Sequence, residues 1–300
     1  MKDLMKYQHK IFKQLGKMAS VRINGYPVNI QLFGPRGTGK SVIARQYAHK
    51  LGLPFTYLNG NSQTSKGDLL GYKNVSGIVV ESEFMKFYRD GGVFVLEEMD
   101  AMPQDVLIAL NTCIDSNIGA FASGMVDRHK DFRLIATSNT YGGGDDNYTA
   151  RKKIDASTLE RFVLLKVNID DSMEKELFGS EYHTIQWIRH DLECKDFSTR
   201  SAVMLIAMKH LGFKEASLMT CFREQQDWWD YEKNKNKVES KLNLKIVTEE
   251  EYNKSLDEIS QFNFDAEEAR EVEAYSGEAE EAGWSKGLRG IEGGRDEAPF

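Results

Sequence analysis

A glycine-rich loop between an apolar run and a helical pattern constrains this chain more than any other feature. The loop, GPRGTGKS at residues 34–41, follows the apolar residues 28–33 and precedes a helical pattern at 42–48. Glycines let a backbone wrap around a phosphate chain so that several N–H groups converge on it, and the following helix adds its positive N-terminal end. The order of strand, glycine-rich loop and helix therefore predicts a nucleotide-binding α/β fold.

The side chains of this loop predict what it holds. Lys40 is placed to reach the β- and γ-phosphates, and the Ser41 hydroxyl is placed to ligate Mg²⁺. The alternative, a glycine-rich surface turn, is disfavoured by the flanking strand and helix. We predict that ATP is bound by the nine residues Gly34, Pro35, Arg36, Gly37, Thr38, Gly39, Lys40, Ser41 and Val42.

Composition narrows the class of protein. Charged residues make up 28% of the 300 residues, hydrophobic residues make up 41%, and the net charge is −7, which suits a globular protein of about two domains without a general attraction to nucleic acid or anionic membranes. The first residues have no apolar signal-peptide core and no apolar run is long enough to span a bilayer, so we expect a cytoplasmic protein. Three widely spaced cysteines without a CxxC pair indicate neither a disulfide framework nor a zinc site.

Strand-like and helix-like segments alternate through the first part of the chain. This alternation predicts a P-loop fold, with a parallel five-stranded sheet sandwiched by helices, a small helical lid and a C-terminal extension. The expected strands cover residues 28–33, 55–59, 93–96, 132–137 and 162–167. We expect hairpins at 72–80 and 124–130. The expected parts are an N-terminal helical segment (1–27), a nucleotide-binding domain (28–169), a lid (170–212), a helical extension (213–263) and an acidic, mobile tail (264–300).

Two adjacent acids, Glu97 and Glu98, follow the third expected strand, where sheets of this kind place their ligand chemistry. Glu97 can hold the Mg²⁺ shell through water, and Glu98 can polarise the attacking water as a general base. A pair of solvated acids is the alternative. The first position is usually Asp, and Glu97 is one methylene longer, so a nucleotide-binding scaffold with impaired turnover also remains open.

Three further polar residues are candidates for contact with the terminal phosphate. Asn139 ends the fourth expected strand, where its amide can reach the γ-phosphate or the attacking water. Arg161 precedes the fifth strand, and Arg200 begins a lid helix. Charge on a transferring phosphoryl group is stabilised by a guanidinium supplied in trans or from a mobile lid. Taken singly, each residue has an ordinary alternative role. Asn139 could simply form a turn, and each arginine could form a surface ion pair.

Together, the motifs GPRGTGKS, VFVLEEMD, FRLIATSNT, DASTLERF and FSTRS, in that order, resemble an AAA+ ATPase. Residues 68–71 and 155–162 are similar to the MoxR and dynein-related branch. Residues 127–146, followed by LERF, resemble the ATPase subunit of aerobic cobaltochelatases, the CobS type. The resemblance covers about residues 28–212 and does not extend to residues 213–300.

The resemblance implies roles for particular residues and an assembly. Lys40 and Ser41 would form Walker A, and Glu97 and Glu98 Walker B. Asn139 would be sensor 1 and Arg200 would be sensor 2. Arg161 would be the arginine finger that reaches a neighbouring subunit's nucleotide. The two hairpins resemble the helix-2 insert and the pre-sensor-1 hairpin. Such proteins form rings, usually hexamers, and commonly have a partner with a von Willebrand A domain.

Two functions follow, and the client remains open. The first is an ATP-driven motor or chaperone of MoxR or CobS type that acts on a protein partner or on metal insertion. The alternative is a nucleic-acid-directed NTPase that resembles McrB or a helicase loader. Basic residues at the expected hairpin tip, Arg128 to Lys130, could touch DNA phosphates or a polypeptide, and the acidic net charge favours the polypeptide. His183 and His190 share a helix face, but two histidines without a third ligand do not indicate a metal site.

Overall fold

The computed structural model describes residues 4–143, 153–192, 194, 197–213, 217, 220 and 236–242. All of them belong to one compact unit, Lys2–Val247. A second unit, Met1 with Thr248–Phe300, lies outside the described residues, as do the acidic tail expected over 264–300 and most of the extension expected over 213–263.

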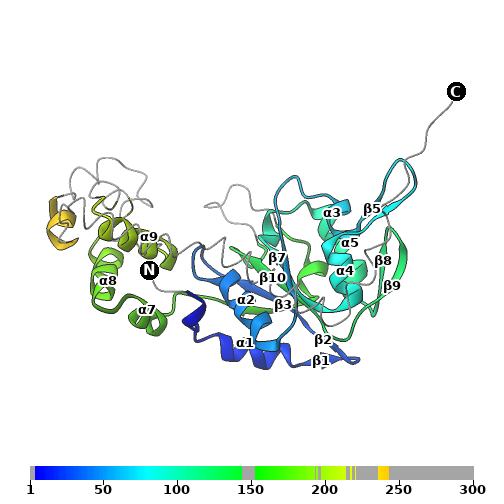
Figure 1. Ribbon diagram of the computed structural model, residues 1–300, viewed down its shortest axis with the longest axis horizontal. Helices are drawn as coiled ribbons and strands as arrows, with labels where there is room; N and C mark the ends of the chain where they lie inside the picture. The colour runs from blue at the N-terminus through cyan, green and yellow to red at the C-terminus, as the bar shows by residue number, and fades with distance from the viewer. Residues whose placement is uncertain are drawn as a thin grey trace, which may run out of the picture. The chain divides into compact units, whose positions relative to one another are not determined.

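Five parallel strands form the central sheet in the spatial order β11-β3-β10-β7-β4. Three of them, β3, β10 and β7, are labelled next to one another in Figure 1. The five strands are β3 (Asn29–Phe33), β4 (Phe55–Asn59), β7 (Gly92–Glu97), β10 (Phe132–Ser138) and β11 (Phe162–Lys166). All neighbouring strands pair in parallel. Each strand begins and ends within one residue of its expected range, and the predicted α/β P-loop fold is confirmed.

Helices cover both faces of the sheet, and the alternation of side chains along the strands decides which core each residue joins. In β7, Val93 and Val95 pack on the face that carries α1 (Phe12–Ala19) and α2 (Lys40–Leu51). Phe94 and Leu96 point to the other face. The helices that cover that face are α3 (Lys66–Leu70), α4 (Glu83–Asp90) and α5 (Gln104–Ile114). A strand buried on both sides explains why residues 93–96 form a continuous apolar run.

Three hairpins project from this sheet-and-helix body. They are β1 (Arg22–Ile23) with β2 (Tyr26–Pro27), β5 (Tyr72–Lys73) with β6 (Val79–Val80), and β8 (Ile118–Phe121) with β9 (Gly124–Asp127). In the first, Asn24 and Gly25 both have positive φ, as a two-residue hairpin turn requires. The second confirms the hairpin expected at 72–80.

The third hairpin differs from the expectation. Residues 124–130 form its second strand and the exit from it, because the short strand Ile118–Phe121 contains a glycine and gave no clear alternation signal. Arg128 therefore lies away from the tip and is only 7% exposed. Its guanidinium donates to the Pro27 carbonyl at 3.0 Å and to Asn29 Oδ1 at 3.3 Å, and burial lowers its pKa to about 10. The predicted basic tip is wrong.

The N-terminal segment also differs from the single helix expected over 1–27. A short 3₁₀ helix, η1 (Leu4–Lys6), is separated from α1 by residues 7–11, here called the N-terminal strap. Two backbone N–H groups of the strap bond to side chains, since Ile11 N donates to His9 Nδ1 at 3.1 Å and Lys10 N donates to Asp170 Oδ2 at 2.5 Å. Side-chain partners of this kind compete with helical hydrogen bonds, which explains the break.

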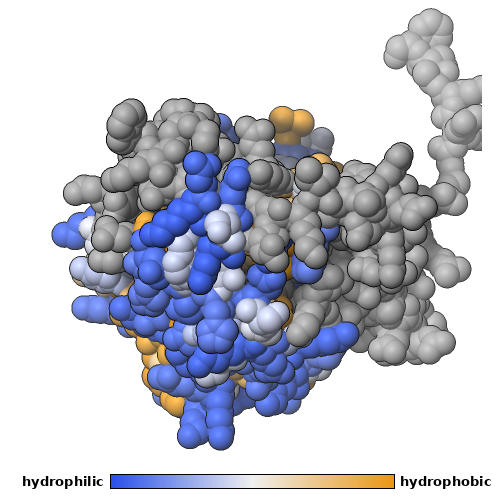
Figure 2. Space-filling model, turned by 90° about the vertical axis from the view of Figure 1, so that its left-hand side faces the viewer, coloured by the Kyte–Doolittle hydropathy of each residue, from blue (hydrophilic) through white to orange (hydrophobic). Residues whose placement is uncertain are grey.

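A small helical body follows β11. Its elements are α7 (Asp171–Phe178), η3 (Gly179–Glu181), α8 (Tyr182–Asp191) and α9 (Thr199–His210), while α6 (Ala156–Leu159) and η2 (Met99–Ala101) belong to the connections of the sheet. The helices pack around Ile185, Ile188, Phe197 and Leu205. The described part of the face on which they lie is largely hydrophilic (Figure 2). Among the described residues, no helix is both long and apolar enough to cross a bilayer.

Candidate nucleotide-binding site

The loop between β3 and α2 has the backbone geometry of a phosphate cradle. Gly37 and Gly39 have φ values of 69° and 88°, in the left-handed region that favours glycine. At Gly34, φ is 149°, and a Cβ atom would lie 2.1 Å from the Val167 carbonyl oxygen. Since α2 begins at Lys40, directly after Gly39, the loop leads into the positive end of a twelve-residue helix. The loop therefore fits the phosphates of a nucleotide.

Lys40 lies inside this loop and is only 8% exposed. Its Nζ donates to the carbonyl oxygens of Gly34 and Pro35, both at 2.8 Å, and to Asn139 Oδ1 at 3.2 Å. The structure thus brings together two residues that the sequence singled out in separate motifs, 99 positions apart. The Thr38 hydroxyl donates to the Pro35 carbonyl at 2.9 Å, which closes the loop on itself.

A buried carboxylate, Asp100, fixes the segment that carries Asn139. Asp100 Oδ2 accepts from Asn139 N at 3.1 Å, Thr140 N at 3.0 Å and the Thr140 hydroxyl at 3.1 Å, and the residue is 1% exposed. Hydrogen bonds to an ionised acceptor are the strong ones. Sequence reasoning missed this residue, whose only signal was a third acid shortly after the expected strand.

Glu97 is the last residue of β7 and Glu98 follows it, and both are half-buried. Glu97 accepts from Gly60 N through its backbone carbonyl at 2.7 Å, and Glu98 N donates to the Thr137 hydroxyl at 3.3 Å. Glu98 has φ 52° and ψ 40°, a left-handed conformation that costs a non-glycine residue about 1–2 kcal/mol. Strain of this kind concentrates at functional sites. Because β10 lies between β3 and β7, Asn139 comes between the phosphate loop and these acids.

The residues predicted to hold Mg²⁺ offer oxygen atoms, the ligands that this ion prefers. Ser41 is exposed in the first turn of α2, and Glu97 is accessible at the end of β7. Within the described ranges, no cluster of three or more His, Cys, Asp or Glu residues could hold a metal ion. Mg²⁺ commonly uses one or two protein oxygens and takes its other ligands from phosphates and water. The donor set therefore fits Mg²⁺ bound together with a nucleotide.

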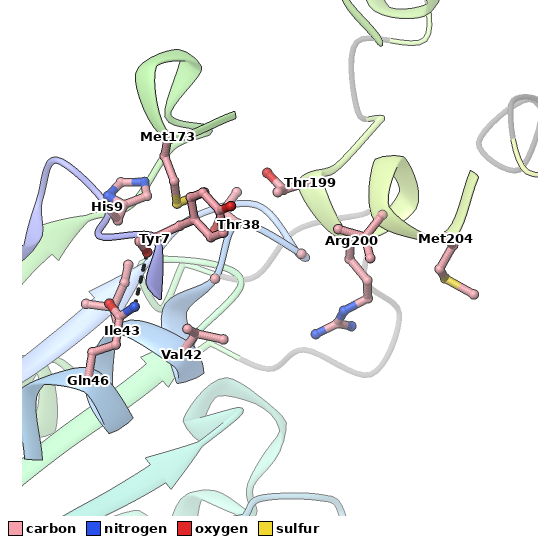
Figure 3. A pocket seen from close by; sticks show the side chains of 13 residues that line it. Tyr7, His9, Thr38, Val42, Ile43, Gln46, Met173, Thr199, Arg200 and Met204 are labelled. Atoms are coloured by element: carbon pink, nitrogen blue, oxygen red, sulfur yellow. Dashed lines mark hydrogen bonds between the residues drawn. The ribbon is translucent and has the colours of Figure 1, made fainter. Parts of the chain in front are cut away.

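Arg200 lies in the first turn of α9, which packs directly on the phosphate loop. Its backbone N–H donates to the Gly37 carbonyl at 3.3 Å. A Cβ atom on Gly37 would lie 2.4 Å from Ser198 Oγ and 3.1 Å from Arg200 Cβ, so glycine is required for this contact. Figure 3 shows the Arg200 side chain extending from α9 toward the side on which α2 begins.

A cavity of about 160 Å³ lies beside the loop, between the N-terminal strap, α2, α7 and α9. Tyr7 and His9 lie on one side of it, and Arg200 and Met204 lie on the other (Figure 3). Its walls include the apolar side chains Val42, Ile43, Met173, Val203 and Met204. A mostly apolar cavity next to a phosphate loop is suited to the base of a nucleotide.

The strap is held in place by side chains from α2 and from the loop after β11. Gln46 Nε2 donates to the carbonyls of Met5 and Tyr7, both at 3.1 Å, and the bond to Tyr7 is drawn in Figure 3. Because His9 Nδ1 accepts from Ile11, its Nε2 carries the proton and donates to the Asn168 carbonyl at 2.8 Å. Burial lowers the pKa of His9. No motif in the sequence marked the strap as part of the site.

Arg161 lies at the opposite end of the sheet from the phosphate loop. Phe162 pairs with Asn29 and Lys166 pairs with Phe33, so the loop and Arg161 are separated by the length of a strand, roughly 17 Å. Arg161 donates to Asp115 Oδ2 at 3.0 Å and to the Ser157 carbonyl. The structure therefore does not bring Arg161 to this chain's own phosphate loop.

A parallel sheet with a glycine cradle, a lysine in the cradle and an amide from the adjacent strand defines a P-loop nucleoside triphosphatase. Residues 29–162 match the family described as AAA domain (dynein-related subfamily). These residues form an AAA domain of that subfamily, and the chain carries an ATPase domain. Proteins with such domains are generally oligomeric.

Relatives of the chain support the same branch. It is 30% identical over 175 residues to midasin from Dictyostelium discoideum, and the match covers 56% of this chain and 3% of midasin. It is 29% identical over 150 residues to aerobic cobaltochelatase subunit CobS from a Sinorhizobium species, which covers 45% of each chain. With denitrification regulatory protein NirQ from Stutzerimonas stutzeri, it shares 26% identity over 159 residues, 51% of this chain and 55% of NirQ. The matched regions span about half of CobS and NirQ and a small part of midasin.

Proposed function

We propose that the protein is an ATP-hydrolysing ring motor or chaperone of the MoxR and CobS type that remodels a protein partner. The observation that carries this proposal is the division of the site between the two ends of the sheet. Lys40 and Asn139 meet at one end, 3.2 Å apart, whereas Arg161 lies at the other end beside Asp115. A second guanidinium for the transferring phosphate, in addition to that of Arg200, would then come from another copy.

In this proposal, residues 28–169 are the nucleotide-binding domain and residues 170–212 are its lid. The triphosphate of ATP lies along residues 34–41, and the base lies in the cavity beside the N-terminal strap. Ser41 and, through water, Glu97 would hold Mg²⁺, which supplies positive charge against the phosphates.

Hydrolysis is assigned to three side chains around the terminal phosphate. Glu98 takes a proton from the attacking water, and Asn139 orients that water or the γ-phosphate. The left-handed backbone at Glu98 supports this assignment, since strain is retained where it directs a functional side chain. Arg200 reaches the phosphates from the lid and makes turnover depend on lid position.

Arg161 is assigned as the finger that serves a neighbouring copy, usually within a hexamer. Its ion pair with Asp115, whose side chain is 60% exposed, is of the weak surface kind and can be exchanged for a phosphate.

The hairpin β5–β6 exposes Val75 and Ile78, which supports a protein client over a nucleic acid. By analogy with CobS-type proteins, a von Willebrand A domain protein is the partner that we propose. The free thiols of Cys113 and Cys194 suit a reducing, cytoplasmic location.

The test is subunit mixing. Lys40→Ala removes nucleotide binding from its own site but keeps Arg161, whereas Arg161→Ala keeps its own site but cannot serve a neighbour. Each variant alone is expected to lose at least about 10³-fold in kcat, since an arginine finger is worth 10³–10⁵. Mixed assemblies are expected to recover part of the activity. Full activity of Lys40→Ala would overturn the ATPase assignment, and a mixture without recovery would overturn the supply of Arg161 in trans.

The same preparation tests the other functions. Stimulation of hydrolysis by duplex or single-stranded DNA, with a steep salt dependence, would favour the nucleic-acid-directed alternative. The burial of Arg128 weighs against it, because one of the three basic residues expected to touch DNA is enclosed. Turnover of the assembled protein that does not exceed that of Glu98→Gln would favour a scaffold with impaired hydrolysis. Comparing turnover with GTP and with ATP measures which nucleotide base the site prefers.

A further inference from the structure

The lid contains a buried ion pair to which the proposed function assigns no role. Glu174 of α7 is fully buried, and both of its carboxylate oxygens are bonded to Arg189 of α8. Arg189 Nη1 donates to Oε2 at 2.6 Å, and Nη2 donates to Oε1 at 2.8 Å. A buried charge pair is often no more stabilising than apolar residues of the same size, so lid stability alone does not account for it.

The ion pair also binds the segment that leads into α9. Arg189 Nε donates to the Phe197 carbonyl at 2.8 Å, and the Thr199 hydroxyl donates to Glu174 Oε1 at 2.6 Å. Between them, Ser198 Oγ accepts from Ser201 N at 3.1 Å and caps the helix. Residues 197–199 are therefore fixed by charge-assisted bonds at both ends and by a helix cap in the middle.

The next residue along the chain is Arg200, and the same segment rests on the phosphate loop. Arg200 N donates to the Gly37 carbonyl at 3.3 Å, and Ser198 fills the space where a Gly37 side chain would be. The segment thus has the ion pair on one side and the loop on the other. Figure 3 shows Thr199 and Arg200 side by side at the start of α9, with the Arg200 side chain extending away from the helix.

We propose that Glu174 and Arg189 are positioning residues that act through Thr199 to set where the Arg200 guanidinium meets the nucleotide phosphates. This inference rests on the role proposed for Arg200. A long side chain keeps its head group in a productive position only if its Cα is fixed, and a misplacement of 1 Å can cost about 10²-fold in rate. The Thr199 hydroxyl is the link, because it joins the ion pair to the residue adjacent to Arg200.

The first variant is Thr199→Val, which removes the hydroxyl, nearly keeps the shape of the side chain and leaves the Glu174–Arg189 pair intact. In the assembled protein we expect kcat for ATP to fall on the order of tenfold. The midpoint of thermal unfolding is expected to fall by about a few degrees, because one charge-assisted hydrogen bond is lost. Thr199→Ser, which keeps the hydroxyl, is expected to restore most of the turnover.

The decisive measurement is the same substitution in an Arg200→Ala background. If Thr199 acts through Arg200, Thr199→Val has little further effect there, within about twofold, whereas an independent structural effect would lower kcat by the same factor again. A second variant, Glu174→Gln, is compared with Glu181→Gln, which breaks a different ion pair of the lid, Lys209 to Glu181 at 2.7 Å. Only Glu174→Gln is expected to lower kcat.

Each outcome of these measurements either supports or overturns the positioning role of Glu174 and Arg189. Equal effects of Thr199→Val in the two backgrounds, or wild-type turnover of Thr199→Val, would overturn the inference while leaving the ATPase proposal intact. Wild-type turnover of Arg200→Ala would overturn both the role of Arg200 and the positioning that depends on it. Loss of activity in Glu181→Gln as large as in Glu174→Gln would indicate that any lid ion pair suffices, and would also overturn it.

Discussion

Two sets of charged residues, Lys40 with Asp100 and Arg161 with Asp115, lie at opposite ends of the central sheet and differ in burial. At the carboxyl end, Lys40 and Asp100 are almost fully buried, and each makes at least three hydrogen bonds of 2.8–3.2 Å. At the amino end, the side chains of Arg161 and Asp115 are 24% and 60% exposed. The first set, here called the buried end, is therefore expected to lose more stability on substitution than the second set, the exposed end. The exposed end carries a cation in an ion pair that costs little to exchange.

Among the substitutions compared here, the largest effect on turnover is expected at Glu98, at the carboxyl end of the sheet. Glu98→Gly is expected to lower kcat for ATP by about 10²–10⁴-fold, because the general base is removed. It should also raise the free energy of unfolding by about 0.5–1 kcal/mol, since glycine tolerates the left-handed backbone but costs more chain entropy. Turnover assays and denaturant titration of the same preparation check the fall in kcat and the rise in the free energy of unfolding. Unchanged turnover would remove Glu98 from the mechanism.

Asp100→Asn is expected to have the next largest effect. The carboxylate accepts three hydrogen bonds through one oxygen, and a neutral amide accepts them more weakly, so unfolding should become easier by about 1–3 kcal/mol. Turnover should also fall, because the Asn139 backbone loses its anchor. Denaturant midpoints and kcat are the measurements, with Asp105→Asn on the exposed start of α5 as the matched control. Equal effects of the two substitutions would show that the buried, three-bonded Asp100 contributes no more to stability than an exposed carboxylate does.

The N-terminal strap adds a pH dependence at the carboxyl end of the sheet. Burial lowers the pKa of His9 below 6.5, so folded His9 stays neutral while the unfolded chain takes up a proton. The unfolded state therefore binds more protons, and stability is expected to fall as the pH drops below about 6.5. Unfolding midpoints at pH 7.5 and 5.5 measure this fall, and His9→Gln should make it shallower. A slope unchanged by His9→Gln would assign the pH dependence to other groups.

The smallest effect on stability is expected for Asp115 at the exposed end. Asp115→Ala breaks a surface ion pair and should change the free energy of unfolding by less than about 1 kcal/mol. Its effect should shrink further in high salt, unlike the effect of Asp100→Asn. Unfolding measured at low and high salt separates the two. A large, salt-insensitive loss of stability would mean that Asp115 has a structural role that its exposure does not suggest.

The sequence predicted well where local signals and a fixed topology coincide. The strands of a parallel sheet are continuous apolar runs, so residues 93–96 and 132–137 could be placed closely from hydrophobicity alone. The phosphate loop needs glycines at defined spacings, and Lys40 and Asn139 follow from strand ends that meet at one edge. The strands and the loop could be predicted from information within a few residues along the chain, whereas Asn139 also depended on its spacing from the acidic pair at 97–98.

The features that were missed depend on partners far away in the sequence. His9 breaks the expected N-terminal helix through bonds that involve Asn168 and, at the next residue, Asp170. Thr199 meets Glu174 across 25 residues, and Asp100 meets Thr140 across 40. The periodicity of hydrophobic residues along the sequence does not predict such bonds. The misplaced hairpin had a different cause, because strand Ile118–Phe121 is too short for alternation to be recognised.

The register of β11 on β3 has a consequence for symmetry. A two-fold dimer pairs residue i of one copy with residue j of the other, and j with i, through a single patch, so it could bring Arg161 to a partner's phosphate loop only if that patch spanned both ends of the sheet. In the ring that we propose, the contact is instead head-to-tail, and each copy donates Arg161 at one interface and accepts it at the next. Such a contact either closes into a cycle or grows without limit, and the rotation between successive copies decides which.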